Sequence, residues 1–193
     1  MNYDCFIGTV RFTDKTYIEN TKWKERKHFT GCAYGLDKPI AKHIPIGKII
    51  YVLEMNNTQN KIMAIGKITN NTKPQNRSRM YKEERYNKYI YKGNDYIHRN
   101  CIINTKSKGD TILKLLETIV FKGKKHFKRG QGCIILRWNR ISTIEKNKVK
   151  RDKSNPNKCA LCGKPIKGHI CSHIKKNEKL EKIIYKWFKC LFN

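Results

Sequence analysis

The strongest strand signal in the chain is Ile49-Ile-Tyr-Val-Leu-Glu-Met55, followed by Asn56-Asn-Thr-Gln-Asn60 and Lys61-Ile-Met-Ala-Ile-Gly-Lys-Ile68. Two apolar runs that are rich in β-branched side chains flank a five-residue turn in which three residues are Asn. This pattern is typical of two antiparallel strands joined by a loop of moderate length. The stretch therefore predicts a β-hairpin, and with it a fold that is built on a sheet.

Further strand signals lie on both sides of this hairpin. Cys5–Phe12 is β-branched and aromatic and predicts a first strand, followed by a polar excursion of mixed charge over residues 13–30. Aromatic side chains alternate with Lys and Asn over Tyr86–Tyr96, around a Gly-Asn turn at 93–94. This second pattern predicts another hairpin, which runs into residues 98–103, and Cys133–Trp138 predicts a last strand.

Two helices are expected. The first begins with Asp110 as its N-cap and ends at Gly123. The second occupies residues 179–191 and places its apolar side chains on one face and Lys on the other. A docked helix is the ordinary interpretation, although a basic amphipathic helix can also lie on a membrane. The apolar stripes are Ile112, Leu115, Leu116, Ile119 and Val120 in the first helix, and Leu180, Ile183, Ile184, Trp187, Phe188 and Leu191 in the second.

A basic, glycine-punctuated segment covers Lys122–Gly132, where five Lys or Arg, one His and three Gly fall together. Glycine lets backbone N–H groups approach an anion, and Lys and Arg neutralise it, so we expect a mobile loop that contacts phosphate. A solvated charge run is the competing interpretation. Trp23 and Trp138 are candidates for base stacking, although a Trp among Lys and Arg more often packs in a core. The candidate nucleic-acid contacts are Lys124, Lys125, His126, Lys128, Arg129, Gln131, Trp23 and Trp138.

A cluster of metal-competent side chains lies near the C-terminus. Cys159 and Cys162 form a Cys-x2-Cys pair that can hold one Zn²⁺, and His169, Cys171 and His173 alternate along an extended segment. Four ligands complete a structural zinc site, so one histidine is surplus. We expect Cys159, Cys162, His169 and Cys171 as ligands, with His173 as the alternative. The segment looks like the Cys-Cys-His-Cys knuckles of nucleic-acid-binding proteins, with a different spacing from the retroviral pattern.

The chain carries a large excess of positive charge. Its 193 residues include 43 Lys or Arg against 15 Asp or Glu, so the formal net charge is +28. A polyphosphate backbone is the natural partner of such a field. An anionic membrane surface would attract the same charge.

Cysteine usage and the first residues indicate a compartment. We find neither a secretory leader nor an apolar run long enough to cross a membrane. Cysteines outside the metal cluster are therefore expected to be buried thiols in a reducing compartment. The expected location is intracellular, in the cytoplasm or nucleus, with a viral factory or a virion as a further candidate.

Pro45-x-Gly47 before the central hairpin and Ile65-Gly66 on its return strand carry a resemblance over about residues 3–141. In these motifs and in strand order the chain resembles the PUA-like superfamily of small β-barrels, which includes the ASCH, EVE and YTH branches. The resemblance implies RNA or modified-base binding in an aromatic-lined pocket with a basic rim. The candidate aromatic residues are Trp23, Tyr34, Tyr91 and Trp138. The block Phe121–Gly132 is also similar to uncharacterised proteins of large DNA viruses.

The expected fold class is α+β. It consists of a small mixed or antiparallel PUA-like β-barrel with one or two helices, followed by a zinc knuckle and an amphipathic helix. The expected domains are 1–141 for nucleic-acid binding, 142–158 as a basic linker, and 159–193 for the knuckle and helix.

The leading hypothesis is a non-enzymatic nucleic-acid-binding protein that prefers RNA to DNA and contains Zn²⁺. A zinc-braced nuclease of HNH type is one alternative, although acids are few and the sequence shows no His-plus-carboxylate cluster for a two-metal site. A basic structural component of a ribonucleoprotein or a virion is the other alternative.

Overall fold

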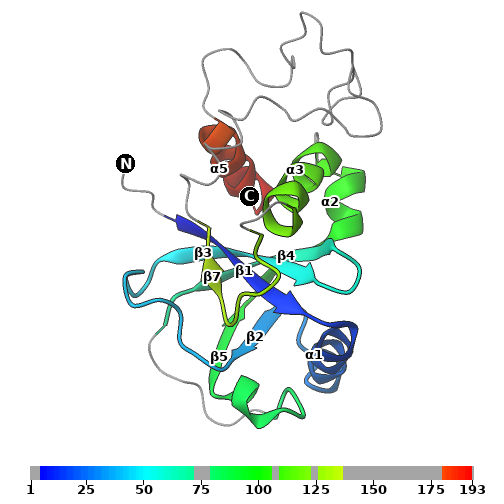
Figure 1. Cartoon of the computed structure of the whole chain (residues 1–193), viewed down its shortest axis with the longest axis vertical. Helices are drawn as coiled ribbons and strands as arrows, with labels where there is room; N and C mark the ends of the chain where they lie inside the picture. The colour runs from blue at the N-terminus through cyan, green and yellow to red at the C-terminus, as the bar shows by residue number, and fades with distance from the viewer. Residues whose placement is uncertain (1–4, 72–78, 106–108, 123–125, 137–179, 193) are drawn as a thin grey trace, which may run out of the picture.

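A computed structural model of the protein describes residues 5–71, 79–105, 109–122, 126–136 and 180–192. A central five-stranded sheet carries a layer of helices on one face, and two strands with one helix on the other (Figure 1). This arrangement confirms the α+β class. The elements are β1 (Cys5–Phe12), α1 (Asp14–Arg26), β2 (Cys32–Leu36), β3 (Ile49–Asn56), β4 (Lys61–Thr69), the 3-10 helix η1 (Glu84–Asn87), β5 (Tyr89–Gly93), β6 (Asp95–His98), α2 (Arg99–Thr105), α3 (Gly109–Phe121), β7 (Ile134–Ile135) and α5 (Leu180–Leu191).

The central sheet has the strand order β6-β4-β3-β1-β7. β3 and β4 form the predicted hairpin, and β1 has the predicted bounds. The side chain of Asn56 closes the hairpin turn, because its Oδ1 accepts hydrogen bonds from the backbone N–H groups of Thr58 (2.9 Å) and Gln59 (3.0 Å). β1 lies parallel to β3, whereas the other neighbours in this sheet are antiparallel.

Side chains of β3 alternate between two cores. Tyr51, Leu53 and Met55 join the core beneath the helices, whereas Ile50 and Val52 join the core against the second layer. Successive strand side chains point to opposite faces of a sheet, so one apolar strand can serve two cores. This explains why β3 reads as a continuous apolar run instead of an alternating one.

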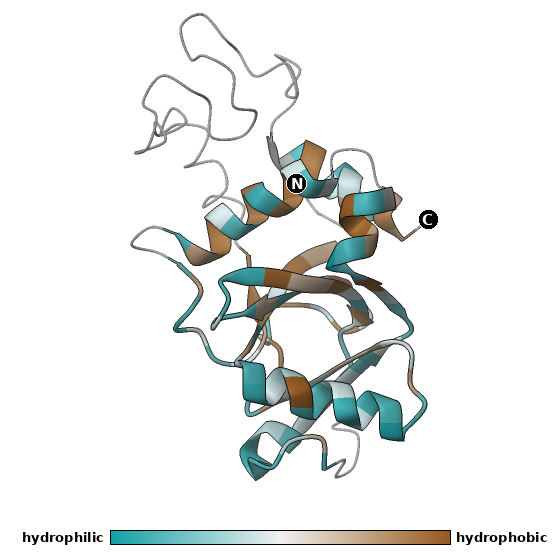
Figure 2. Cartoon of the chain, turned by 90° about the vertical axis from the view of Figure 1, so that its right-hand side faces the viewer, coloured by the Kyte–Doolittle hydropathy of each residue, from teal (hydrophilic) through white to brown (hydrophobic). Residues whose placement is uncertain are grey.

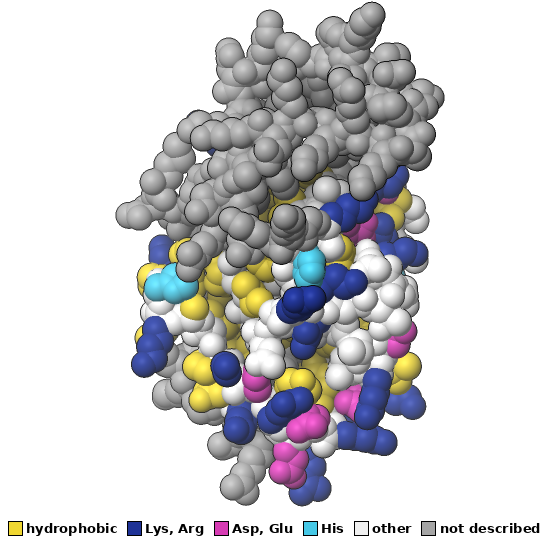
Figure 3. All heavy atoms as spheres, in the orientation of Figure 1, with side chains coloured by type: hydrophobic (Ala, Val, Ile, Leu, Met, Phe, Trp, Pro, Cys, Tyr) yellow, Lys and Arg dark blue, Asp and Glu magenta, His cyan; other side chains and the backbone are white. Residues whose placement is uncertain are grey.

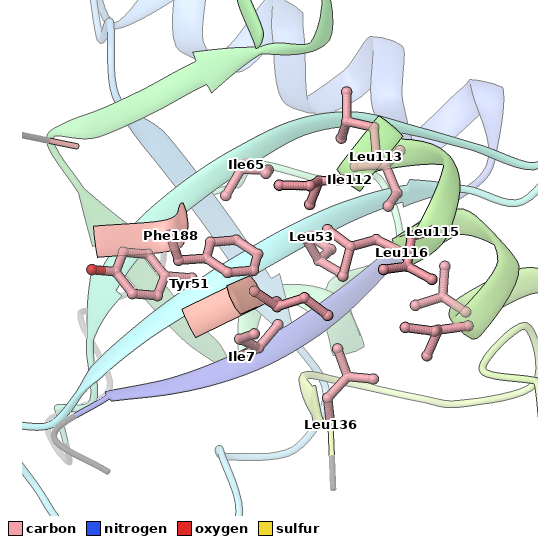
Figure 4. Close-up of a cluster of buried hydrophobic side chains, with 14 of the residues drawn as sticks. Ile7, Tyr51, Leu53, Ile65, Ile112, Leu113, Leu115, Leu116, Leu136 and Phe188 are labelled. Atoms are coloured by element: carbon pink, nitrogen blue, oxygen red, sulfur yellow. The ribbon is translucent and has the colours of Figure 1, made fainter. Parts of the chain in front are cut away.

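Two helices of the helical layer, α3 and α5, form where the sequence predicts helices. All five predicted stripe residues of α3 are buried, from Ile112 to Val120. Figure 2 shows helices lying over one face of the sheet, and Figure 4 shows Leu113, Leu115 and Leu116 in one cluster with Leu53 and Ile65. The helix begins at Gly109, two residues before the residue that should follow an Asp110 N-cap, so Asp110 lies in its first turn and pairs with Lys114 at 2.7 Å instead of capping it.

α5 docks on the sheet. Phe188 is 0% exposed, and its ring stacks on Tyr51 of β3 with the centroids 5.1 Å apart (Figure 4). Ile184 and Leu191 are buried in the same core, so α5 packs on residues of the first predicted domain. The docked alternative is therefore the one that the structure shows. Within the described ranges, no helix is both long and apolar enough to span a membrane.

The second layer contains a helix that the sequence did not predict. α1 lies within the expected polar excursion, and a reciprocal pair of hydrogen bonds between Thr13 and Thr16 caps its first turn. Its buried residues are Asn20 and Trp23, so the helix has a narrow buried face and no broad apolar stripe. α1 packs beside β2 and β5, which pair with each other in a separate two-stranded sheet.

The second predicted hairpin is wrong. β5 pairs with β2, whereas β6 pairs with β4 in the central sheet, so the two strands diverge at Gly93. A Cβ at Gly93 would lie 1.9 Å from the backbone oxygen of Lys67, so this close approach between the sheets requires glycine. Residues 99–105, which follow β6, form α2. Of the predicted last strand, Ile134–Ile135 are described as β7, and residues 137–138 lie outside the described residues.

Cysteine burial differs in part from the expectation. Cys5 and Cys32 are buried and Cys133 is half-buried, but Cys101 and Cys190 are exposed. The last two lie on the outer surfaces of α2 and α5, where the helices face away from the sheet. The expectation of buried thiols therefore does not hold for these two residues.

Candidate binding pocket

The sequence-predicted site residues divide into two groups. The zinc candidates Cys159, Cys162, His169, Cys171 and His173 lie outside the described residues, as do Lys124, Lys125 and Trp138. The linker over residues 142–158 does too. The structure places His126, Lys128, Arg129 and Gln131 in one segment, and Trp23 in the core of the second layer.

Trp23 is 3% exposed, and its ring packs edge-on against Phe29 with the centroids 6.2 Å apart. Lys92 Nζ lies 5.2 Å from the centre of the Trp23 ring. This burial favours the core-packing interpretation of Trp23 over base stacking.

Residues 126–132 are anchored to the sheet. The backbone oxygen of Lys128 accepts hydrogen bonds from Arg11 Nη1 and from Asn57 Nδ2, each at 2.8 Å. Phe127 is buried in the helix-side core, and its N–H donates to the backbone oxygen of Val120 at 2.8 Å. One apolar side chain and three hydrogen bonds therefore hold the described part of the predicted loop against the rest of the protein.

The anchored segment forms one wall of a pocket. The pocket has a cavity of about 80 Å³, several times the roughly 10–15 Å³ that one water molecule needs. It lies where β1 ends and α1 begins, and the end of β2 and the region of η1 close it. The lining residues are Val10, Arg11, Phe12, Thr13, Thr16, Gly35, Leu36, Asp37, Tyr81, Tyr86, Gly130, Gln131 and Gly132.

Two tyrosines form the aromatic wall of the pocket. The rings of Tyr81 and Tyr86 meet edge to face with the centroids 6.2 Å apart. They pack on β2 at Gly35, where a Cβ would lie 2.3 Å from the Tyr86 backbone oxygen and 2.7 Å from Tyr81 Cε2. Arg85 covers Tyr86 with its guanidinium carbon 4.9 Å from the ring centre. Any side chain at position 35 would therefore displace this wall.

Buried hydrogen bonds fix Tyr81 from behind. Asn20 Nδ2 donates to Tyr81 Oη at 3.0 Å and to the backbone oxygen of Ala33 at 2.8 Å. Burial raises the pKa of Tyr81, so its phenol stays neutral at physiological pH. Asn87 Oδ1 accepts hydrogen bonds from the backbone N–H groups of Met80 (2.9 Å) and Tyr81 (3.0 Å). The aromatic wall is thus a rigid surface.

Asp37 lines the pocket with a hydrogen-bond acceptor that no donor satisfies among the described residues. Its Oδ1 is buried and has no hydrogen-bond partner among the described residues. A Cβ at Gly132 would lie 3.8 Å from this oxygen, which places the carboxylate beside the anchored segment. Arg11 and the Thr13–Thr16 pair, which also line the pocket, are already used, because Arg11 binds Lys128 and the threonines cap α1. A buried acceptor without a donor is costly, so Asp37 is suited to a ligand that brings one.

A second polar cluster lies between the central sheet and β2. Tyr34 Oη donates to Glu54 Oε1 at 3.0 Å, and the two side chains are 0% and 1% exposed. Burial raises the pKa of the Glu54 carboxyl, and the positive charge of Lys24 offsets part of this increase. Burial and the nearby Glu54 also raise the pKa of the Cys32 thiol to about 11. Tyr91, another predicted aromatic, is buried and accepts the backbone N–H of Ile40 at 3.1 Å. Tyr34 and Tyr91 therefore serve packing in this structure.

Sequence reasoning missed Arg11, Asp37, Tyr81 and Tyr86. They lie on three segments (β1, the end of β2 and the stretch around η1) that only the fold brings together, so no local sequence motif indicates them. Gln131 is the predicted contact that also lines the pocket. Glu54 had a detectable signal, because a carboxylate inside an apolar strand needs a buried partner.

On the face that Figure 3 shows, the described Lys and Arg side chains do not gather into a single patch. Figure 3 shows Lys and Arg distributed over one face among hydrophobic and acidic side chains. Among the described residues, no group of three or more His, Cys, Asp or Glu side chains is arranged to hold a metal ion. Comparisons of the chain with protein-family models, curated proteins and solved structures found no match.

Proposed function

We propose that the protein binds nucleic acid without catalysing a reaction on it, and that it prefers single-stranded or structured RNA. The observation that carries the proposal is the pocket. It combines an aromatic wall, Tyr81 and Tyr86, with the unmet acceptor Asp37 and with Gln131 of the basic segment. Bases that are splayed from single strands bind to aromatic side chains and hydrogen-bond along their exposed edges.

The charge of the chain supports a polyanionic partner. A net charge of +28 attracts a phosphate backbone and speeds its encounter with the protein. Lys128 and Arg129 lie next to the pocket wall, and Lys124 and Lys125 precede them in sequence. In this proposal these residues contact phosphates, while the pocket takes a base.

The proposal extends to the parts that sequence patterns predict. The strands would belong to a PUA-like barrel, and the cysteines and histidine at 159–171 would hold a structural Zn²⁺ that stabilises a second contact surface. Such zinc sites are closed, so the metal would contribute folding and not chemistry. Assembly into a ribonucleoprotein or a virion would use the same contacts.

Anisotropy titrations with a fluorescent single-stranded RNA test the proposal. Tyr86→Ala should weaken binding by about 1–3 kcal/mol, the range for a base stacked on an aromatic ring. Tyr86→Phe, the matched control, keeps the ring and should retain binding. Equal affinity of the Ala and Phe variants would contradict a role for this wall. Cleavage of labelled RNA or DNA in Mg²⁺ that is lost in His126→Ala or His173→Ala would instead establish an enzyme.

A further inference from the structure

The pocket contains a feature that general RNA binding does not require. Asp37 has neither a hydrogen bond nor an ion pair with any described residue, although its Oδ1 is buried. A nonspecific single-strand site uses cations and aromatic rings, and a carboxylate there repels phosphate. This unpaired carboxylate therefore indicates selection for a group that donates hydrogen bonds.

We propose that this pocket selects guanine, with the Asp37 carboxylate accepting the base's adjacent N1–H and N2–H donors. The inference rests on the proposed function. Guanine is the standard base that presents two neighbouring N–H donors on its Watson–Crick edge, and a carboxylate offers two acceptor oxygens side by side. Adenine, cytosine and uracil each present an acceptor beside their donor, and this acceptor would face a carboxylate oxygen.

The surroundings of Asp37 favour a base over a free cation. The rings of Tyr81 and Tyr86 provide an apolar wall for a planar ligand. The chain's charge of +28 opposes the approach of a small cation but attracts a base that is carried on a phosphate backbone. Gln131, exposed at the rim, adds an amide that can donate to an acceptor of the base, such as guanine O6.

The test uses the full chain and a labelled oligouridine in which one central position is varied. Guanine at that position should bind on the order of 10-fold more tightly than uracil. Inosine, which keeps N1–H but lacks the N2 amino group, should fall between them. Asp37→Asn should remove the guanine preference and leave the affinity for plain oligouridine nearly unchanged.

Asp110→Asn is the matched control, because it also removes one negative charge but lies on α3 beside Lys114. It should keep the preference for guanine. Equal affinity of the wild type for the guanine, inosine and uracil oligomers, or a guanine preference that survives Asp37→Asn, would overturn the inference while RNA binding stands. Failure of every oligomer to bind would overturn the proposed function itself. The comparison of guanine with inosine needs no protein variant, so it tests the guanine preference even if Asp37→Asn does not fold.

Discussion

Tyr34 donates a hydrogen bond to Glu54 across the boundary between the two sheets, with 3.0 Å between Tyr34 Oη and Glu54 Oε1. Tyr34 belongs to β2 and Glu54 to β3, so this bond joins the second layer to the central sheet. The two side chains are fully enclosed, and the pocket opens beside the same β2 strand. The polar contact thus holds the layer that carries Asp37.

Replacement of Glu54 by Gln should change the pH dependence of stability. Burial raises the pKa of Glu54 above its ordinary value of 4.5, so the folded state binds this proton more tightly than the unfolded state. The free energy of unfolding that Glu54 contributes therefore falls as pH rises from about 4.5 through the raised pKa. The Glu54→Gln variant would keep an acceptor for Tyr34 without this loss.

Urea unfolding of the wild type and Glu54→Gln between pH 4 and pH 8 measures the effect. The stability of the variant relative to the wild type should increase with pH, by about 1.4 kcal/mol for each unit by which the pKa is raised. Glu25→Gln, at an exposed position of α1, controls for the loss of one negative charge. A stability difference that is constant over this pH range would contradict the assignment.

Phe188→Ala should destabilise the protein by about 3–5 kcal/mol, because it removes a large side chain from a closed core. The ring is 0% exposed and stacks on Tyr51. Lys186→Ala on the exposed face of the same helix should stay within about 0.5 kcal/mol of the wild type. Chemical denaturation compares the two variants, and similar stabilities would show that α5 does not dock on the sheet.

The predicted zinc site can be tested by metal analysis of the purified chain. We expect one Zn²⁺ per chain, lost in Cys162→Ala because a thiolate ligand is removed. His169→Ala should lose the metal and His173→Ala should retain it. The opposite result for the two histidines would exchange their roles, and a metal-free wild type that binds no added Zn²⁺ would exclude the site.

Strong local patterns predicted much of the fold. The hairpin of β3 and β4 follows from two β-branched runs around an Asn-rich turn, and α3 follows from an apolar stripe. The sequence did not predict α1, because its buried residues are Asn20 and Trp23, and Asn in a polar segment does not indicate burial. The false hairpin arose because strand pairing over Tyr86–Tyr96 depends on distant partners, β2 and β4, and not on the turn.

The candidate site was predictable only in its basic segment. Gly and Lys or Arg within Lys122–Gly132 marked that segment, and the structure places Gln131 in the pocket. Asp37, Tyr81 and Arg11 carried no signal, because each is ordinary in its own stretch and acquires a role from tertiary contacts. A pocket that is assembled from distant segments is therefore visible only after the chain has folded.

The salt dependence of RNA binding tests the central claim most directly. The affinity of the full chain for a labelled single-stranded RNA is measured at several salt concentrations from about 50 to 200 mM. A plot of log affinity against log salt should fall linearly with a slope of about −0.7 for each phosphate neutralised. Lys128→Ala should make this slope shallower, whereas Lys186→Ala should not. Absence of binding, or an affinity that does not change with salt, would contradict the account.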